Sequence, residues 1–125
     1  MVNMGEATEN DRKKIVIRKD SKAFFHNNVD YCVGTGRMGL ALTEEYQEEL
    51  RLVQKEIGFK HIRGHGLFCD DMAIFQTYEE DGKVRVEYNY TYLDRVMDAY
   101  KKVGLRPFLE LGFMPKKLAS GSQTI

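Results

Sequence analysis

Apolar residues recur along this chain at spacings that predict helices and strands in alternation. We expect a first amphipathic helix with Thr43 as its N-cap, and the left-handed position at Gly58 to end it. Its apolar stripe follows at intervals of four, three and four residues: Tyr46, Leu50, Val53 and Ile57. Two strands are expected on either side of this helix: a short β-branched one at Ile15-Val16-Ile17, and one from Phe59 to Gly66 immediately after the helix.

The second half of the chain repeats the alternation after a hairpin. Two alternating arms between Ile74 and Tyr90 surround an Asp81-Gly82 turn, which is a strong hairpin signal. Thr91-x-x-Asp94 predicts the cap of a second helix, with Gly104 at its end. The buried stripe expected for that helix contains Leu93, Val96, Met97, Tyr100 and Val103. A further strand is predicted from Leu105 to Gly112.

These two halves echo each other. Residues 55–66 and 101–112 each read as the end of a helix, a glycine, a strand and a second glycine. Such βα units joined by short loops predict an α/β fold with a parallel sheet and right-handed crossovers. Ligands of parallel sheets bind at the C-terminal ends of the strands, so the residues beside Gly34, Gly66 and Gly112 are the ones to inspect.

Composition narrows the class of protein. The chain has 125 residues, 42% of them hydrophobic, so it allows one modest globular domain; a closed eight-stranded α/β barrel needs about 250. Lys plus Arg and Asp plus Glu each number 19, which predicts no nucleic-acid partner, and no apolar stretch reaches the roughly 20 residues that cross a membrane. The two cysteines, Cys32 and Cys69, form no disulfide framework, and we expect a reducing, cytoplasmic location.

The glycine-rich segment from Gly34 to Gly39 fits the letters G-x-G-x-x-G, which in a dinucleotide-binding fold cradles a pyrophosphate. The fingerprint requires a helix that opens within the motif, but Leu40-Ala41-Leu42 intervenes before Thr43. We therefore favour a flexible strand-to-helix loop, with nucleotide binding as the weaker alternative.

Arg63 and His65 are better placed candidates. Strand side chains alternate, so both should share one face while Ile62 packs on the helices from the other. A guanidinium at the end of a strand could hold a carboxylate or sugar hydroxyls, and the imidazole could donate or accept beside it. From position alone, a structural role is an equally good interpretation, in which Arg63 pairs with an interior carboxylate and His65 is a hydrogen-bonded core histidine.

The other polar residues are weaker candidates for a functional site. Alternation aligns Leu109 and Leu111 with Arg63 and His65, so Glu110 should face the other way and have a structural or supporting role. Neither His26 nor His61 has metal-ligand spacing with Cys32 or Cys69, and we expect neither a metal nor a cofactor.

Several longer motifs resemble the start of the β-xylosidases of glycoside hydrolase family 39, with α-L-iduronidases as more distant relatives. The segments that carry this resemblance lie between Tyr31 and the last residue, in order: Cys32-Val-Gly-Thr-Gly-Arg-Met-Gly-Leu-Ala-Leu42, Ile62-Arg-Gly-His-Gly-Leu67, Tyr88-Asn-Tyr-Thr-Tyr-Leu-Asp94, Arg106-Pro-Phe-Leu-Glu-Leu-Gly-Phe-Met-Pro115 and Lys117-Leu-Ala-Ser-Gly121.

The resemblance implies the N-terminal fragment of a TIM (β/α)8 barrel, about its first three βα units. Residues 1–28 would be a lead-in segment with a short strand, and residues 29–125 a partial barrel domain with the hairpin inserted over its mouth. It also implies that Arg63 and His65 line the subsite for the non-reducing xylose of a short β-1,4-xyloside, which favours their binding role.

The same resemblance implies that the catalytic motifs of the family are missing from this sequence. The family's acid/base glutamate sits in an Asn-Glu-Pro motif, which does not occur here, and Thr43-Glu44-Glu45-Tyr46 opens a helix and cannot replace the nucleophile motif. A retaining glycosidase needs both carboxylates, so we assign no catalytic residue and expect this chain alone to be inactive. The alternative is a small non-catalytic binding protein that associates with itself, since a partial barrel leaves open strand edges and would favour a homo-oligomer.

Overall fold

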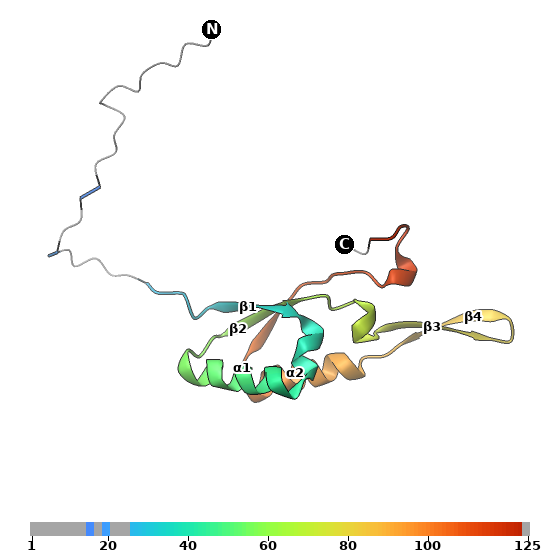
Figure 1. The fold of residues 1–125 in the computed structure, drawn as a ribbon, viewed down its shortest axis with the longest axis horizontal. Coiled ribbons are helices and arrows are strands. Elements are labelled where there is room, and N and C mark those ends of the chain that lie inside the picture. Colours follow the sequence, from blue (N-terminus) through green and yellow to red (C-terminus); the bar gives the residue numbers. More distant parts are fainter. Residues whose placement is uncertain (1–14, 17–18, 21–25, 124–125) are drawn as a thin grey trace, which may run out of the picture.

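The structure is a computed structural model, which describes residues 15–16, 19–20 and 26–123. Three strands, β1 (Cys32–Arg37), β2 (His61–His65) and β5 (Arg106–Leu109), form a parallel sheet in the order β1-β2-β5. Helix α1 (Glu44–Glu56) connects β1 to β2, and helix α2 (Thr91–Lys102) precedes β5. Both helices lie on the same side of the sheet (Figure 1). The predicted α/β fold with a parallel sheet is confirmed.

The hairpin predicted between Ile74 and Tyr90 is also confirmed. Strands β3 (Phe75–Glu80) and β4 (Lys83–Tyr88) pair antiparallel around Asp81 and Gly82, whose φ angles of 52° and 69° are both positive. Two consecutive positive φ angles define the type I′ turn that suits the twist of a two-residue hairpin. The hairpin projects from the sheet and helices as an arm (Figure 1).

The core lies between the sheet and the two helices. Its largest fully buried side chains come from both layers and from the connecting segments: Tyr100, Met38, Ile62, Met72 and Val96. The stripe predicted on α2 packs into this core, completely at its centre and partly at its ends. On α1 only Leu50 is fully buried, and Ile57 is wrong as a core residue because the helix ends at Glu56 and leaves Ile57 54% exposed.

Helix ends follow the predicted glycines and, for α1 alone, the predicted cap residue. Gly58 and Gly104 have φ angles of 74° and 76°, as expected where the chain leaves a helix. Thr43 occupies the N-cap position of α1, but its hydroxyl donates to the carbonyl oxygen of Leu40 at 2.8 Å instead of accepting from the helix. Thr91 is already the first helical residue, and its N–H donates to Oδ1 of Asn89 at 2.9 Å, so the cap predicted at Thr91 is wrong.

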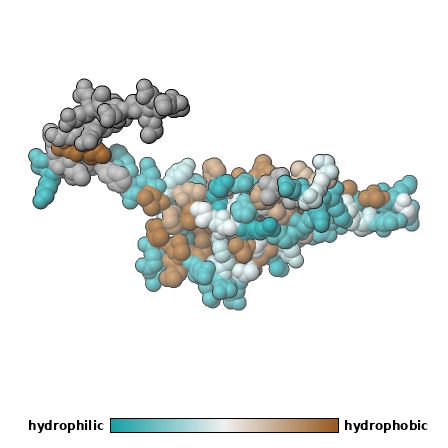
Figure 2. All heavy atoms as spheres, turned by 45° about the horizontal axis from the view of Figure 1, so that its top comes forward, coloured by the Kyte–Doolittle hydropathy of each residue, from teal (hydrophilic) through white to brown (hydrophobic). Residues whose placement is uncertain are grey.

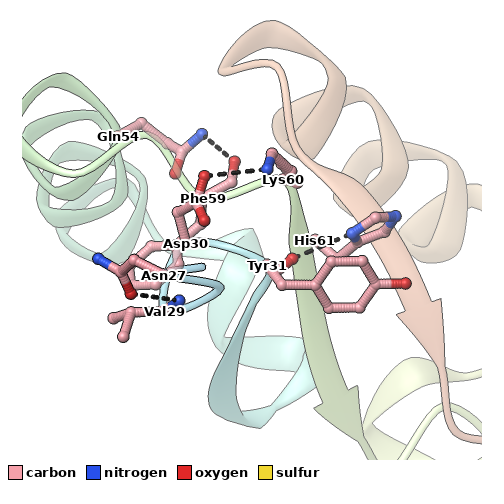
Figure 3. Close-up of polar contacts among 8 residues, drawn as sticks. All are labelled: Asn27, Val29, Asp30, Tyr31, Gln54, Phe59, Lys60 and His61. Carbon is pink, nitrogen blue, oxygen red and sulfur yellow. Dashed lines mark hydrogen bonds and ion pairs between the residues drawn. The ribbon is translucent and has the colours of Figure 1, made fainter. Parts of the chain in front are cut away.

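Polar contacts fix the N-terminal ends of β1 and β2 (Figure 3). The Lys60 ammonium lies 3.1 Å from the Asp30 carboxylate, and Nδ1 of His61 lies 3.0 Å from the backbone oxygen of Tyr31. The Gln54 amide of α1 donates to two backbone oxygens at 3.0 and 3.2 Å, those of Phe59 and Val103. These contacts join both loops that enter the sheet, at the end remote from Arg63 and His65.

The strand predicted in the lead-in segment lies partly within the described residues. Of the predicted strand Ile15-Val16-Ile17, the first two residues lie in no strand and are 86% and 61% exposed. Ile17 and residues 1–14 lie outside the described residues. No helix in the described part of the chain is long and apolar enough to span a bilayer.

Candidate functional site

The C-terminal ends of the three parallel strands bring the candidate residues to one edge of the sheet. Strand β1 ends at Arg37, β2 at His65 and β5 at Leu109, with Glu110 immediately after. This edge is where parallel sheets bind their ligands, because loops there diverge and leave space.

Strand β2 presents Arg63 and His65 on one face, as the alternation predicted. Ile62 is 1% exposed on the helix side, and Gly64 is buried there, where a Cβ would lie 3.6 Å from the Met38 methyl carbon. Arg63 is exposed and His65 half-buried on the opposite face. Because Gly64 has no Cβ, the helix layer can approach strand β2 closely on this face, while Arg63 and His65 point away from it.

Arg63 has a carboxylate partner, Glu110, and this contradicts the predicted direction of Glu110. Nη2 of Arg63 lies 2.5 Å from Oε2 of Glu110. The sheet register pairs Arg63 with Phe108, so residues 108 and 110 share the Arg63 face, whereas the sequence echo had aligned Leu109 with Arg63. The alignment of the two repeated segments is wrong by one residue, because the loop after Gly104 is one residue shorter than the loop after Gly58. Arg106 therefore pairs with His61. The supporting role expected for Glu110 agrees with this ion pair.

His65 lies beside an aromatic ring that the sequence did not indicate. Its imidazole and the ring of Phe113 have centroids 5.6 Å apart, tilted by 52°. Nδ1 of His65 is enclosed and has no hydrogen-bond partner among the described residues. Phe113 follows the end of β5, where no periodicity predicts direction, so only the path of the chain reveals this neighbour.

The glycine-rich segment differs from both of its interpretations. Residues 34–37 continue strand β1 rather than forming a loop, and a 3-10 helix, Met38–Leu42, follows. Helix α1 begins only at Glu44, so no α-helix N-terminus lies within the motif. The geometry on which nucleotide binding depends is absent from this segment, and that alternative gains no support.

Beside this edge lies a polar cavity of about 300 Å³ that the sequence did not predict. Arg37 contributes its guanidinium 3.8 Å from the Asp71 carboxylate, and Oδ1 of Asp70 accepts from the Lys116 N–H at 3.1 Å. Both acidic residues thus have partners, and the described residues contain no cluster of three or more side chains suited to a metal ion.

A larger apolar cavity of about 550 Å³ lies where the hairpin meets the segment after β5. Its walls are mostly aromatic and aliphatic, including Phe75, Tyr88, Phe113, Met114 and Leu118. Because Phe113 also contacts His65, this cavity adjoins the candidate site.

Comparison with known proteins decides which family this arrangement represents. Residues 13–125 match the sequence profile of Glycosyl hydrolases family 39. The chain belongs to glycoside hydrolase family 39. This family 39 chain is 50% identical over 113 residues to a β-xylosidase of Geobacillus stearothermophilus, and 37% identical over 95 residues to a β-xylosidase of Caldicellulosiruptor saccharolyticus. The matches cover 90% and 75% of the chain.

Solved structures of family 39 have the same fold over most of the chain. A β-xylosidase from Caulobacter crescentus superimposes with a TM-score of 0.66 at 33% identity, over 74% of this chain. An enzyme from Xanthomonas axonopodis pv. citri gives a TM-score of 0.62 at 35% identity, again over 74%. In both cases the sequence and the fold agree, which confirms the resemblance drawn from the motifs.

The family 39 chain spans about a fifth of the length of these relatives: 22% and 19% of the two β-xylosidase sequences and 20% and 17% of the two structures. Four-fifths of each relative therefore has no counterpart in the 125 residues.

Proposed function

We propose that this chain forms the N-terminal part of the barrel of a retaining β-xylosidase and contributes binding residues, but no catalytic carboxylate, to its site. The observation that carries the proposal is the placement of Arg63 and His65 together at the C-terminal end of the central strand, in a chain 50% identical to a β-xylosidase. A β-xylosidase removes xylose from the non-reducing end of β-1,4-xylosides.

In this proposal residues 29–125 form the first part of an eight-stranded barrel, whose first three strands are β1, β2 and β5. Residues 1–28 lead into the barrel. The exposure of β5 supports this. Phe108, on the Arg63 face, is 55% exposed, and Leu109, on the helix face, is 45% exposed. A fourth strand beside β5, with its own helix, would cover both side chains and pair the open edge.

Arg63 and His65 bind the hydroxyls of the terminal xylose. A guanidinium presents several donors in a fixed plane, and Glu110 at 2.5 Å limits the rotation of that plane. The half-buried imidazole of His65 can donate or accept beside the guanidinium, and the adjoining Phe113 ring offers an apolar surface. Glu110 is a positioning residue in this arrangement, because its carboxylate is engaged by Arg63.

Hydrolysis with retention needs two carboxylates about 5–5.5 Å apart, one as nucleophile and one as acid/base. Among the described residues, Glu110 is the carboxylate beside Arg63, and it is paired. The pair that performs the chemistry belongs to strands beyond residue 125, so the 125-residue chain does not hydrolyse xylosides.

Two assays test the proposal. The chain alone should release no 4-nitrophenol from 4-nitrophenyl β-xyloside. A chimera in which its 113 aligned residues replace those of the Geobacillus relative should be active. Turnover by the chain alone that a mechanism-based xyloside inhibitor abolishes would refute the assignment of the carboxylates, and an inactive but folded chimera would refute the barrel assignment.

A further inference from the structure

The outer edge of β4 is free to accept another strand. In a hairpin closed by a two-residue turn, the residues that flank the turn, Glu80 and Lys83, exchange both backbone hydrogen bonds. The bonding then alternates, so Val84, Val86 and Tyr88 direct their N–H and C=O groups away from β3. No backbone partner for these groups occurs in the described part of the chain.

β4 is regular along its whole length. The strand has six residues, Lys83–Tyr88, without proline, glycine or a bulge. It lies on the arm that projects from the sheet and helices, and apolar atoms are visible toward the end of that arm (Figures 1 and 2). Val84, Val86 and Tyr88 are 75%, 52% and 61% exposed. Charged side chains, which often protect such an edge, occur in β4 as Lys83, Arg85 and Glu87, but both signs are present and a strand of complementary charge would neutralise them.

We propose that β4 pairs antiparallel with β4 of a second copy of this chain, about a two-fold axis at Val86. In this register the two Val86 residues lie opposite each other, and Val84 lies opposite Tyr88 of the second copy. The outward-pointing backbone groups of all three residues are then bonded. The two hairpins become one four-stranded antiparallel sheet.

Charge selects this register over its neighbours. Centred on Val86, pairing places Arg85 opposite Glu87 of the second copy, twice across the axis, in the closely spaced positions where side chains interact most. Centred on Arg85, it would keep two attractive pairs, Lys83 opposite Glu87, but would set two guanidinium groups opposite each other at the axis. Centred on Glu87, it would set two carboxylates opposite each other there. Arg85 also lies 3.3 Å from Glu80 of its own hairpin, but both side chains are half-exposed and this contact leaves room for a second carboxylate.

Apolar side chains reinforce the pairing. Phe75 and Tyr88 pack edge to face with ring centroids 6.0 Å apart, on the hairpin face that also carries Val84 and Val86. A two-fold axis perpendicular to the sheet would place these faces of both copies on the same side and bring Val84 against the second Tyr88. One family 39 relative from Caulobacter crescentus is described as monomeric, so the pairing would depend on the sequence of β4 rather than on the family fold.

A charge swap tests the proposal independently of xyloside binding. Wild-type chain should show twice its 14.5 kDa mass by light scattering across a concentration series. Arg85→Glu and Glu87→Arg should each weaken the dimer about tenfold or more, since two attractive pairs become repulsive. The double variant Arg85→Glu/Glu87→Arg should restore it, which a damaged hairpin would not do. Monomeric wild type, or any association that Arg85→Glu leaves unchanged, overturns the proposal, and association through β1 or β5 would behave in that way.

Disulfide trapping tests the register. Opposed residues of a hydrogen-bonded pair have Cα atoms about 5.5 Å apart, within the range a disulfide bridges. Val86→Cys should therefore yield a covalent dimer under mild oxidation. In Val84→Cys the two thiols would lie about 14 Å apart, four residues along the strand, and should not cross-link. Wild type gives the background from Cys32 and Cys69. Equal cross-linking of the two variants contradicts the register.

Discussion

Replacing Tyr100 with phenylalanine should make the chain more resistant to alkaline unfolding. Tyr100 is 1% exposed in the core, and its hydroxyl has no hydrogen-bond partner among the described residues. The neighbouring Tyr46 hydroxyl is engaged by the hydroxyl of Thr35. Burial raises the pKa of Tyr100 above its ordinary value of 10.0, and Tyr46 raises it further.

The direction of the effect follows from the raised pKa. The unfolded chain loses the phenolic proton near pH 10, while the folded chain holds the neutral form to higher pH. The stability associated with the neutral phenol is therefore complete below pH 10 and is lost as the pH rises toward the folded-state pKa. One extra proton in the folded state corresponds to about 1.4 kcal/mol for each pH unit above 10.

Urea unfolding of wild type and Tyr100→Phe, at about pH 8 and about pH 11, measures this difference. At the lower pH the variant should be as stable as wild type or about 1 kcal/mol more stable, since an unpaired buried hydroxyl is removed. At the higher pH its advantage should grow by about 1.4 kcal/mol. The remaining titratable groups are identical in the two proteins, so parallel pH profiles would show that Tyr100 is not held neutral in the core.

Three further substitutions test the account of the fold, each by urea unfolding. Ile62→Ala should lower the free energy of unfolding by about 2–5 kcal/mol, because the side chain is 1% exposed at the centre of the core; a loss below about 1 kcal/mol would contradict its position. Gly104→Ala should lower it by about 1–2 kcal/mol from its φ of 76° alone, since no atom lies within 4 Å of the new Cβ. Gly34→Ala, equally open but without a positive φ, is the matched control, and equal losses would refute the backbone argument. Glu110→Gln should lower it by less than about 1 kcal/mol, because both it and Arg63 are partly solvated; a larger loss would mean that the pair supports the fold.

Local periodicity and turn chemistry predicted most of the elements. The hairpin, both helix-ending glycines and the buried stripe of α2 depend on short-range patterns, and all are found. The cap predicted at Thr91 failed because α2 already includes that residue. Thr43 occupies the predicted N-cap position of α1, but its hydroxyl bonds to an earlier carbonyl rather than to the helix. At Thr43 the preceding 3-10 helix supplies that carbonyl.

The candidate site could be predicted only as far as each strand alone determines it. Alternation within β2 placed Arg63 and His65 correctly on one face. The position of Glu110 depends on how β5 aligns with β2, and a one-residue difference in loop length reversed it. The Phe113 ring beside His65 follows from the path of the chain after β5, which carries no periodic signal.

The central claim is that Arg63 binds the terminal xylose, and the inhibition constant of free xylose against the chimera tests it most directly. Arg63→Ala should raise that constant about tenfold or more, because a charged donor to a sugar hydroxyl contributes about 1.5–3 kcal/mol. The matched control is Arg51→Ala, since the Arg51 side chain on α1 is 54% exposed compared with 55% for that of Arg63. Arg51→Ala should leave the constant unchanged. An equal constant for both variants in folded, active chimeras would contradict the assignment of the subsite.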